Sequence, residues 1–341
     1  MIYFESDYTE GAHPEIMKRL METNMEQTSG YGTDFYCESA RNKIKEICRK
    51  KDAYIQFLVG GTQTNSIVIA SVLKPYQGVI CSSTGHINVH ETGAVEATGH
   101  KVLAIPTADG KITAEIAEKI CNAHLHDVNH EHMVQPGMVY ISYPTENGLI
   151  YGEKELKDLY KVCKKYEIPL YIDGARLGYG LMARGSDMTF AKMADLCDIF
   201  YIGGTKVGGL FGEAVVIVNP LYQKNFRYMI KRNGAMLAKG RLLGIQFDTL
   251  FTDDLYLRIS EHADIMAMKL KEAFSHVGYN FLFDSVTNQQ FPILTNEKMK
   301  ELSENYNYEV WKKIDEKYTA VRFCTSWATK EENVEKLIGE L

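Results

Sequence analysis

Short runs of β-branched and aromatic residues recur through the first two thirds of the chain and predict seven β-strands. These runs lie at 54–59, 79–83, 101–105, 138–143, 169–172, 198–202 and 215–218. Between most of them, apolar residues repeat at helical spacing, for example at 64–73, 113–125, 153–166 and 188–196. Strands that alternate with helices of this length indicate an α/β fold, with a mostly parallel seven-stranded sheet covered by helices on both faces.

The alternation of short strands and helices ends at Asn219-Pro220. Long helical stretches follow at 221–232 and 237–277, with an interruption at Gly234, and then candidate strands at 279–283, 290–294 and 320–324 and helices at 298–305 and 331–341. This mixture predicts a smaller α+β domain. We therefore expect an N-terminal arm over residues 1–14, a large α/β domain over 15–246 and a small C-terminal α+β domain over 247–341.

Composition narrows the class of protein. The chain has 341 residues, of which 45% are hydrophobic and 24% charged, as in an ordinary globular protein. A net charge of −6 gives no basic surface for a nucleic acid. No apolar run is long enough for a membrane span, the N-terminus lacks a signal-peptide pattern, and the seven cysteines form no C-x-x-C pair. We expect a cytoplasmic protein that binds neither nucleic acid nor membrane.

Polar and glycine-rich segments directly follow five of the predicted strands. They are Gly60-Gly61-Thr62, Thr84-Gly85-His86, Pro144-Thr145-Glu146, Asp173-Gly174-Ala175-Arg176 and Gly203-Gly204-Thr205-Lys206. Ligands of open α/β sheets bind beyond the carboxyl ends of the strands. We therefore expect these segments to meet in one site.

The Gly60-Gly61-Thr62 turn has two interpretations. It leads into a predicted helix, whose first backbone N–H groups and positive dipole end would hold a phosphate, with the Thr62 hydroxyl as an added donor. It is also a common way to join a strand to a helix. No Gly-Lys-Ser or Gly-Lys-Thr follows, so it is not a Walker A loop.

Lys206 and Asp173 stand out for their surroundings. Lys206 lies in a loop of small residues between two apolar strands, where desolvation would lower the pKa of its amine and favour a Schiff base. The alternative is a lysine that reaches water from a loop tip. Asp173 ends the apolar run 170–172, so its carboxylate would be partly buried and would need a cationic partner, for which Arg176 is one candidate.

The segment from Asp173 to Arg176, with a loop lysine thirty residues later, resembles the threonine aldolase and β-eliminating lyase family. Its members are fold-type-I enzymes that depend on pyridoxal phosphate. Further motifs follow in family order along almost the whole chain: Ser6-Asp7, Tyr31-Gly32-x-Asp34, Gly61-Thr62-x-x-Asn65, His86 with Glu91, Thr145-x-Asn147-Gly148 and Val321-Arg322-Phe323. The chain is similar to a divergent branch of low-specificity L-threonine aldolases.

The resemblance implies a complete set of cofactor-binding residues. Lys206 would carry pyridoxal 5'-phosphate as a Schiff base and act catalytically. Asp173 would pair with the ring nitrogen and keep it protonated, which makes the ring an electron acceptor. His86 would stack on the ring and take part in catalysis, and Gly61 and Thr62 would bind the phosphate.

The resemblance also implies the substrate-binding residues. Arg176 and Arg322 would lie near the cofactor hydroxyl and the substrate carboxylate, because the arginine fork binds a carboxylate bidentately. Ser6 would add a hydrogen bond to that carboxylate. Tyr31 resembles a residue that faces the site near a subunit interface, although Gly30-Tyr31-Gly32 is also a simple turn sequence.

Two departures from the family fall on the substrate side. Where many relatives have a histidine in a Thr-His-Asn-Gly segment, this chain has Glu146, which we predict to be the catalytic base if burial desolvates it. The alternatives are a water held by His86 or His90, or a different reaction. Glu5 also stands before the Ser-Asp pair of the arm, where many relatives have arginine.

The family implies a homodimer or homotetramer with shared active sites and a small amino acid as substrate. Lys231, Arg232 and Lys239 are candidates for reaching a neighbouring subunit's phosphate, or they are charges on a helix surface. His124, His126, His130 and His132 lie within nine residues, but no cysteine accompanies them and we expect no metal site.

The resemblance therefore implies a pyridoxal phosphate-dependent aldolase that cleaves L-threonine, L-allo-threonine or a related β-hydroxy-α-amino acid to glycine and an aldehyde. One alternative keeps the cofactor and changes the bond that breaks, as in a β-eliminating lyase. The other is a non-catalytic binding protein that has kept the fold.

Overall fold

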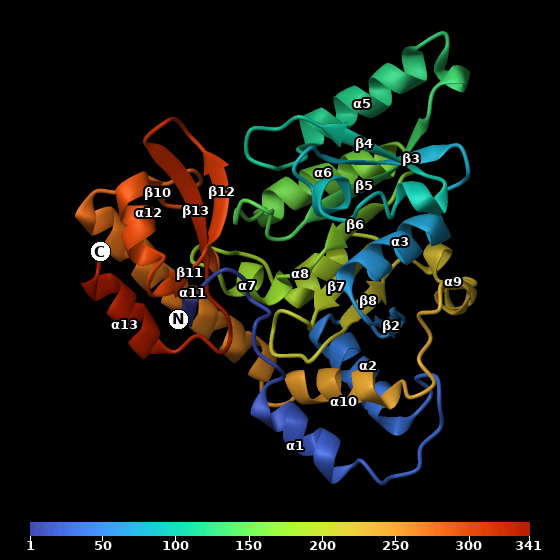
Figure 1. The fold of residues 1–341 in the computed structure, drawn as a ribbon. Helices are drawn as coiled ribbons and strands as arrows, with labels where there is room; N and C mark the ends of the chain where they lie inside the picture. The colour runs from blue at the N-terminus through green and yellow to red at the C-terminus, as the bar shows by residue number, and fades with distance from the viewer.

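The computed structural model describes residues 1–341, and its large sheet contains the seven predicted strands (Figure 1). These are β2 (Tyr54–Leu58), β3 (Gln77–Ser82), β4 (Lys101–Ile105), β5 (Gln135–Ser142), β6 (Leu170–Asp173), β7 (Ile199–Gly203) and β8 (Glu213–Ile217). Their order across the sheet is β2-β8-β7-β6-β5-β3-β4. Only β8 runs antiparallel to its neighbours, so the expected mostly parallel sheet is confirmed.

Both faces of this sheet are buried. Along β5, Val139 and Ile141 join one hydrophobic cluster while Met138 and Tyr140 join another, as the two-residue period of a strand requires. The first cluster includes α2 (Phe35–Ile47), α5 (Ala114–His126), α6 (Glu153–Lys165), α7 (Leu177–Met182), α8 (Phe190–Asp195) and α10 (Arg241–Leu250). The second includes α3 (Gly61–Val72), α4 (His86–Val89) and α9 (Phe226–Arg232). Burial on two sides explains why the strands read as nearly continuous apolar runs.

The prediction of one long helix over 237–277 is wrong, because the structure has two helices there. The segment divides into α10 and α11 (Leu255–Val277), because Asp253 and Asp254 adopt positive φ angles of 50° and 54° between them. Aspartate tolerates this left-handed conformation, which a helix cannot contain. Similarly, the expected helix over 221–232 forms only a short 3₁₀ turn (Pro220–Tyr222) before α9.

The C-terminal residues form a smaller sheet, drawn in orange and red in Figure 1. It contains β9 (Gln289–Gln290), β10 (Ile293–Thr295), β12 (Glu309–Lys313) and β13 (Tyr318–Cys324), and it lies with α11, α12 (Asn296–Leu302) and α13 (Glu331–Gly339). The expected strand over 290–294 is interrupted at Pro292, which has no N–H group to donate. The expected strand over 279–283 is a single bridge between Phe281 and Pro292. Strand β12, which is polar and largely exposed, was not predicted.

The N-terminal arm connects the two parts of the molecule. Strand β1 (Ile2–Tyr3) pairs with β11 (Tyr306–Asn307), and Phe4 packs in the core of the small sheet. The arm then passes Arg176, and α1 (Pro14–Glu22) packs against α10. The division into arm, large and small domains stays a prediction. Because residue 246 lies inside α10, we propose that the large domain ends after that helix.

No helix combines the length and the apolar character that a membrane crossing requires.

Candidate active site

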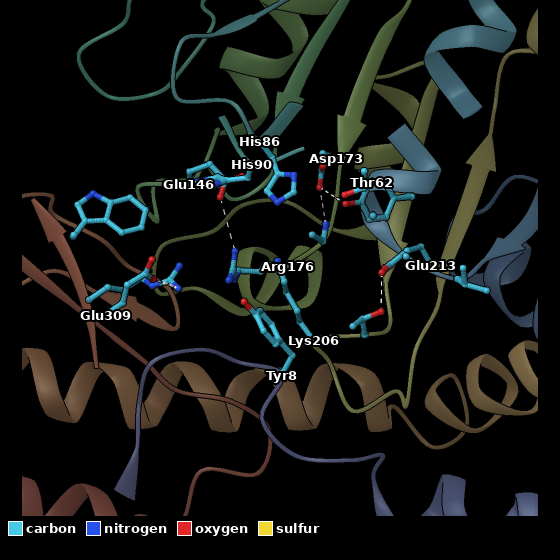
Figure 2. A pocket seen from close by; sticks show the side chains of 18 residues that line it. Tyr8, Thr62, His86, His90, Glu146, Asp173, Arg176, Lys206, Glu213 and Glu309 are labelled. Atoms are coloured by element: carbon cyan, nitrogen blue, oxygen red, sulfur yellow. Dashed lines mark hydrogen bonds and ion pairs between the residues drawn. The ribbon is translucent and has the colours of Figure 1, made fainter. Parts of the chain in front are cut away.

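A cavity of about 520 Å³ lies at the carboxyl ends of the parallel strands, where the large sheet, the arm and the small sheet meet (Figure 2). Among its lining residues are Gly61, Thr62, His86, Glu146, Asp173, Arg176, Lys206 and Arg322. The ends of five different strands thus contribute residues to one cavity, as the strand-end rule predicts. We call Gly61, Thr62, His86, Asp173 and Lys206 the sheet wall.

One end of the sheet wall has the chemistry of an anion site. Helix α3 begins at Gly61, and its N-cap, Gly60, provides no side chain to bond the first backbone N–H groups. A Cβ atom at Gly61 would stand 3.2 Å from the Tyr201 hydroxyl, so only glycine leaves this space open without displacing its neighbour. Thr62 is exposed beside it and adds a hydroxyl. These donors and the positive end of the helix fit a phosphate group.

The carboxylate of Asp173 is buried among hydrogen-bond donors. The Tyr140 hydroxyl donates to Oδ2 at 2.6 Å and the Tyr201 hydroxyl to Oδ1 at 2.5 Å, while the Asn65 amide donates to Oδ2 at 3.0 Å. Burial raises the pKa of Asp173, but the charge of His86 and these hydrogen bonds outweigh it and leave the pKa below its ordinary value. Asp173 is therefore a fixed negative charge suited to a cationic nitrogen.

Arg176 is not the partner of Asp173 that the sequence allowed. Its guanidinium instead binds Asp7 of the arm, with Nε to Oδ2 at 2.6 Å and Nη2 to Oδ1 at 3.0 Å. Although burial raises the pKa of Asp7, Arg176 and Lys206 together lower it to about 2. Only Nη1 of Arg176 is left toward the cavity, where it lies 4.0 Å from Glu146 Oε2.

His86 is held in place by Glu91. Nδ1 of His86 lies 2.7 Å from Glu91 Oε1, and Glu91 is buried. Desolvation lowers the pKa of His86, but the hydrogen bond to Glu91 and the charges of Glu146 and Asp173 raise it overall. A second imidazole, that of His90, lies nearby, with 5.4 Å between the ring centroids of His86 and His90.

Lys206 is half-buried and points into the cavity, with its Nζ 5.9 Å from the centre of the Tyr8 ring (Figure 2). No carboxylate lies within ion-pair distance of this amine. Burial and the nearby positive charge of Arg176 lower the pKa of Lys206. A lower pKa increases the neutral fraction of the amine, which is the form that attacks a carbonyl.

Glu146 follows β5 and stands between the two histidines and Arg176. Its Oε1 accepts a hydrogen bond from the Ser142 hydroxyl at 3.2 Å, and its side chain is 13% exposed. Figure 2 shows it on the side of the cavity that His86 and His90 occupy. Its position allows it to take a proton from a substrate held over the sheet wall.

The arm and the small sheet supply the rest of the cavity. We call these residues, which are Tyr8, Glu309, Trp311 and Arg322, the outer wall. Arg322 forms an ion pair with Glu309 and lies over the Trp311 ring, with 5.3 Å from its Cζ to the ring centre. Nη1 of Arg322 also donates to Gln289 Oε1 at 2.8 Å.

Two predicted site residues do not line the cavity. Ser6 is half-buried in the arm next to it. Tyr31 lies in a separate hollow, where its backbone carbonyl accepts a hydrogen bond from Arg227 and the Lys231 amine stands 4.8 Å from its ring centre. The roles assigned to Ser6 and Tyr31 stay predictions.

Several residues of the cavity were not predicted. Tyr8, Glu309 and Trp311 carry no pattern of their own, because they reach the cavity from an irregular arm and a polar edge strand. Glu213 is different, since it is a charged residue at the start of an apolar strand, and that contrast marks it in the sequence. It is buried, accepts hydrogen bonds from the Thr205 hydroxyl at 2.8 Å and the Gly204 N–H at 3.2 Å, and burial raises its pKa to about 8.

The histidines of the 124–132 segment lie on α5 and on a 3₁₀ turn (His130–His132) away from this cavity. The rings of His124 and His130 are 5.8 Å apart. No group of three histidine, cysteine or acidic side chains gathers there or elsewhere in a metal-binding arrangement.

The donor set fits pyridoxal phosphate. A glycine cradle and a helix N-terminus match its phosphate, a buried ionised carboxylate matches its ring nitrogen, and an unpaired lysine amine matches its aldehyde. His86 is placed to cover the space between them.

Comparisons with known proteins point in the same direction. The family model described as "Beta-eliminating lyase" matches residues 4–296. A low specificity L-threonine aldolase of Pseudomonas aeruginosa is 29% identical over 99% of this chain and 96% of its own length. The structure of a Leishmania major threonine aldolase superimposes with a TM-score of 0.97 at 41% identity, covering 100% of this chain and 98% of that one. A histidinol-phosphate aminotransferase from Clostridium acetobutylicum shares the fold with a TM-score of 0.73 at 14% identity, covering 100% and 98% of the two chains.

Proposed function

The chain belongs to the β-eliminating lyase family and has the fold of the fold-type-I pyridoxal phosphate enzymes, and on that basis we propose a carbon–carbon lyase activity. The substrate would be L-threonine, L-allo-threonine or a related β-hydroxy-α-amino acid, and the products would be glycine and an aldehyde. The threonine aldolases among its relatives support this choice.

One observation carries the proposal. A single cavity holds a free lysine amine of lowered pKa, a buried carboxylate kept ionised and two arginines. The amine of Lys206 would hold the cofactor aldehyde, and Asp173 its ring nitrogen. When bound, pyridoxal phosphate supplies a ring that accepts the electron pair of the bond that breaks at the substrate α-carbon.

The remaining residues would position the substrate and move protons. Arg322 presents a fixed guanidinium to the substrate carboxylate, while Asp7 holds Arg176 so that only its Nη1 faces the cavity. Glu146 would accept the proton of the β-hydroxyl, because cleavage next to that carbon requires its removal.

We further propose that the protein works in the cytoplasm as a homodimer or homotetramer with shared active sites. Tyr31 and Lys231, which lie together on the surface, would contribute to the neighbouring subunit's site. The scattered cysteines, all of them unpaired and buried, support a reducing compartment.

The test is acetaldehyde release from L-threonine and from L-allo-threonine by the purified protein loaded with pyridoxal phosphate. Release of acetaldehyde with one equivalent of glycine is the expected result. Ammonia and a keto acid from a serine-like or cysteine-like substrate, without aldehyde from either threonine isomer, would instead identify a β-eliminating lyase.

A further inference from the structure

Glu309 and Arg322 face each other across the antiparallel pair β12/β13 and line the cavity together. Oε2 of Glu309 is in ion-pair contact with Nη2 of Arg322. The one guanidinium of the outer wall is therefore already occupied by a carboxylate of the same chain.

The two partners differ in how firmly they are held. Arg322 is 10% exposed, donates to Gln289 Oε1 at 2.8 Å and to the Glu5 carbonyl at 3.1 Å, and lies over the Trp311 ring. Glu309 is 43% exposed and has no other side-chain hydrogen bond. Arg322 is a fixed element of the site, whereas Glu309 can turn toward solvent.

Strand β12 leaves room for such a movement. It is the edge strand of the small sheet, and its register with β13 shifts between Val310 and Lys312, so Trp311 lies at the irregular position. Edge strands and bulges place fewer backbone constraints on their side chains than central strands do. The Glu309 side chain is 43% exposed as a whole although its paired Oε2 is buried, and only this contact holds it, so it can be exchanged for another carboxylate.

Arg322 also retains capacity for a ligand. Its Nε is buried and has no hydrogen-bond partner in the structure. A guanidinium that offers Nε together with Nη2 presents a fork for a bidentate carboxylate. Glu309 contacts only the Nη2 side of that fork.

From these contacts we propose that Glu309 is an internal competitor of the substrate: its carboxylate occupies Arg322 in the free enzyme and leaves when the α-carboxylate of the amino acid binds. The inference rests on the proposed function, since it takes Arg322 as the carboxylate-binding residue. It makes Glu309 a residue that sets substrate affinity by competition for Arg322. The occupant it favours is a small monocarboxylate, which can bind Nη2 and Nε of Arg322 together, whereas Glu309 contacts only Nη2.

The test compares wild type with Glu309→Gln, both loaded with pyridoxal phosphate. Propionate, a carboxylate without an amine, is used as a competitive inhibitor of threonine cleavage. We expect its Ki and the KM for L-threonine to fall together by about three- to tenfold in the variant, because the competing state no longer lowers the binding-competent fraction. The effect falls on KM and Ki rather than on kcat.

Glu316→Gln is the matched control. Glu316 lies in the turn between the same two strands, is 92% exposed and pairs with Lys313 at 3.0 Å away from the cavity. The Glu316→Gln substitution removes one negative charge from the same hairpin, and both KM and Ki should stay at their wild-type values. Unchanged or increased KM and Ki in Glu309→Gln would overturn the proposal and show that Glu309 instead orients Arg322.

A second measurement separates this inference from the proposed function. The chain has two tryptophans, so replacing Trp327 with phenylalanine leaves Trp311, which is stacked on Arg322, as the single tryptophan, and its emission is excited selectively over that of the tyrosines. Propionate titration of that protein follows occupation of Arg322 without turnover. Tighter binding after Glu309→Gln supports the competition even if threonine is not cleaved, whereas equal binding refutes it even if threonine is cleaved.

Discussion

The sheet wall and the outer wall of the cavity are built in different ways. Every residue of the sheet wall follows or directly ends a strand of the large sheet, and the charge of Asp173 is held by tyrosines of the two neighbouring strands. The outer wall comes from an irregular arm and from two paired strands of the small sheet, β12 at its edge and β13 beside it, and its charges satisfy one another, as Glu309 and Arg322 do. The sheet wall is thus prepared for a resident cofactor, and the outer wall for a ligand that enters and leaves.

Under the proposed function, this difference separates cofactor binding from substrate binding in the chain. A cofactor held by rigid strand ends needs a fixed charge and an anion cradle, which the sheet supplies at no cost in loop ordering. The residues proposed to bind substrate have partners that lie far away in sequence, such as Asp7 with Arg176. Substitutions on the two walls should therefore have distinct signatures.

The largest effect should come from Lys206→Ala on the sheet wall. Removal of the only amine placed to bond the cofactor aldehyde should abolish the yellow absorbance band and reduce turnover by at least about a thousandfold. Lys192→Ala, which removes an exposed lysine paired with Glu153, is the control and should keep both. A yellow Lys206→Ala protein with a stable cofactor bond would show that another lysine carries it.

Glu146→Gln tests the point where the two walls meet. If Glu146 takes the proton of the substrate hydroxyl, kcat should fall by about 10² to 10⁴, while pyridoxal phosphate binds as in the wild type. Steady-state kinetics together with the absorbance of the bound cofactor measure both quantities. Wild-type kcat in the variant would move the proton transfer to a water held by His86 or His90, which lie beside it.

Asp7→Asn tests how the arm contributes to the outer side of the site. The lowered pKa of Asp7, about 2 against an ordinary 3.8, means that its charged form stabilises the fold by about 2 kcal/mol above pH 4. That contribution is lost as the pH falls from about 4 to about 2. The variant should lose about 2 kcal/mol of unfolding free energy at neutral pH, and the difference from wild type should narrow over this acidic range.

Urea unfolding at a series of pH values measures this difference, with Asp52→Asn as the control on an exposed aspartate. A pH-independent difference would mean that the ion pair with Arg176 is not what Asp7 contributes. A loss larger than the pKa accounts for would reflect the guanidinium left buried without its partner.

The sequence predicted the sheet wall better than the outer wall for a physical reason. Parallel strands bring their carboxyl ends to one edge, so the segments after the strands could be grouped from the strand pattern alone, and Lys206, Asp173 and His86 do line one cavity. What the pattern lacked was the order of strands across the sheet. That order brings Tyr140 and Tyr201 to either side of Asp173, although they are far apart in sequence.

The outer wall leaves almost no local signal. Strand β12 has charged or polar residues at most positions, so neither helical nor strand periodicity marks it, and Glu309 reads as a surface residue. Arg322 was identified only through family resemblance, and Asp7 was noted as part of a motif without its partner. The pairing of Asp7 with Arg176 depends on the path of the arm across the molecule, which no periodicity encodes.

The smallest effect should come from Glu213→Gln, which tests whether the buried carboxyl beside the sheet wall is protonated in the folded protein. Burial raises the pKa of Glu213 to about 8 from an ordinary 4.5, so the folded state binds its proton more tightly than the unfolded state does. Wild-type stability must then decrease as the pH rises through the window from about 4.5 to about 8, and the decrease ends above it. Glutamine has no proton to lose, so the stability of the variant relative to wild type should increase by about 1 kcal/mol between about pH 7 and about pH 9.

Thermal unfolding of the cofactor-free protein at a series of pH values measures this difference in stability, with the exposed Glu304→Gln as the control. A constant difference between Glu213→Gln and wild type across that range would mean that Glu213 is ionised in the folded protein, and that the sheet wall carries a second buried negative charge beside Lys206.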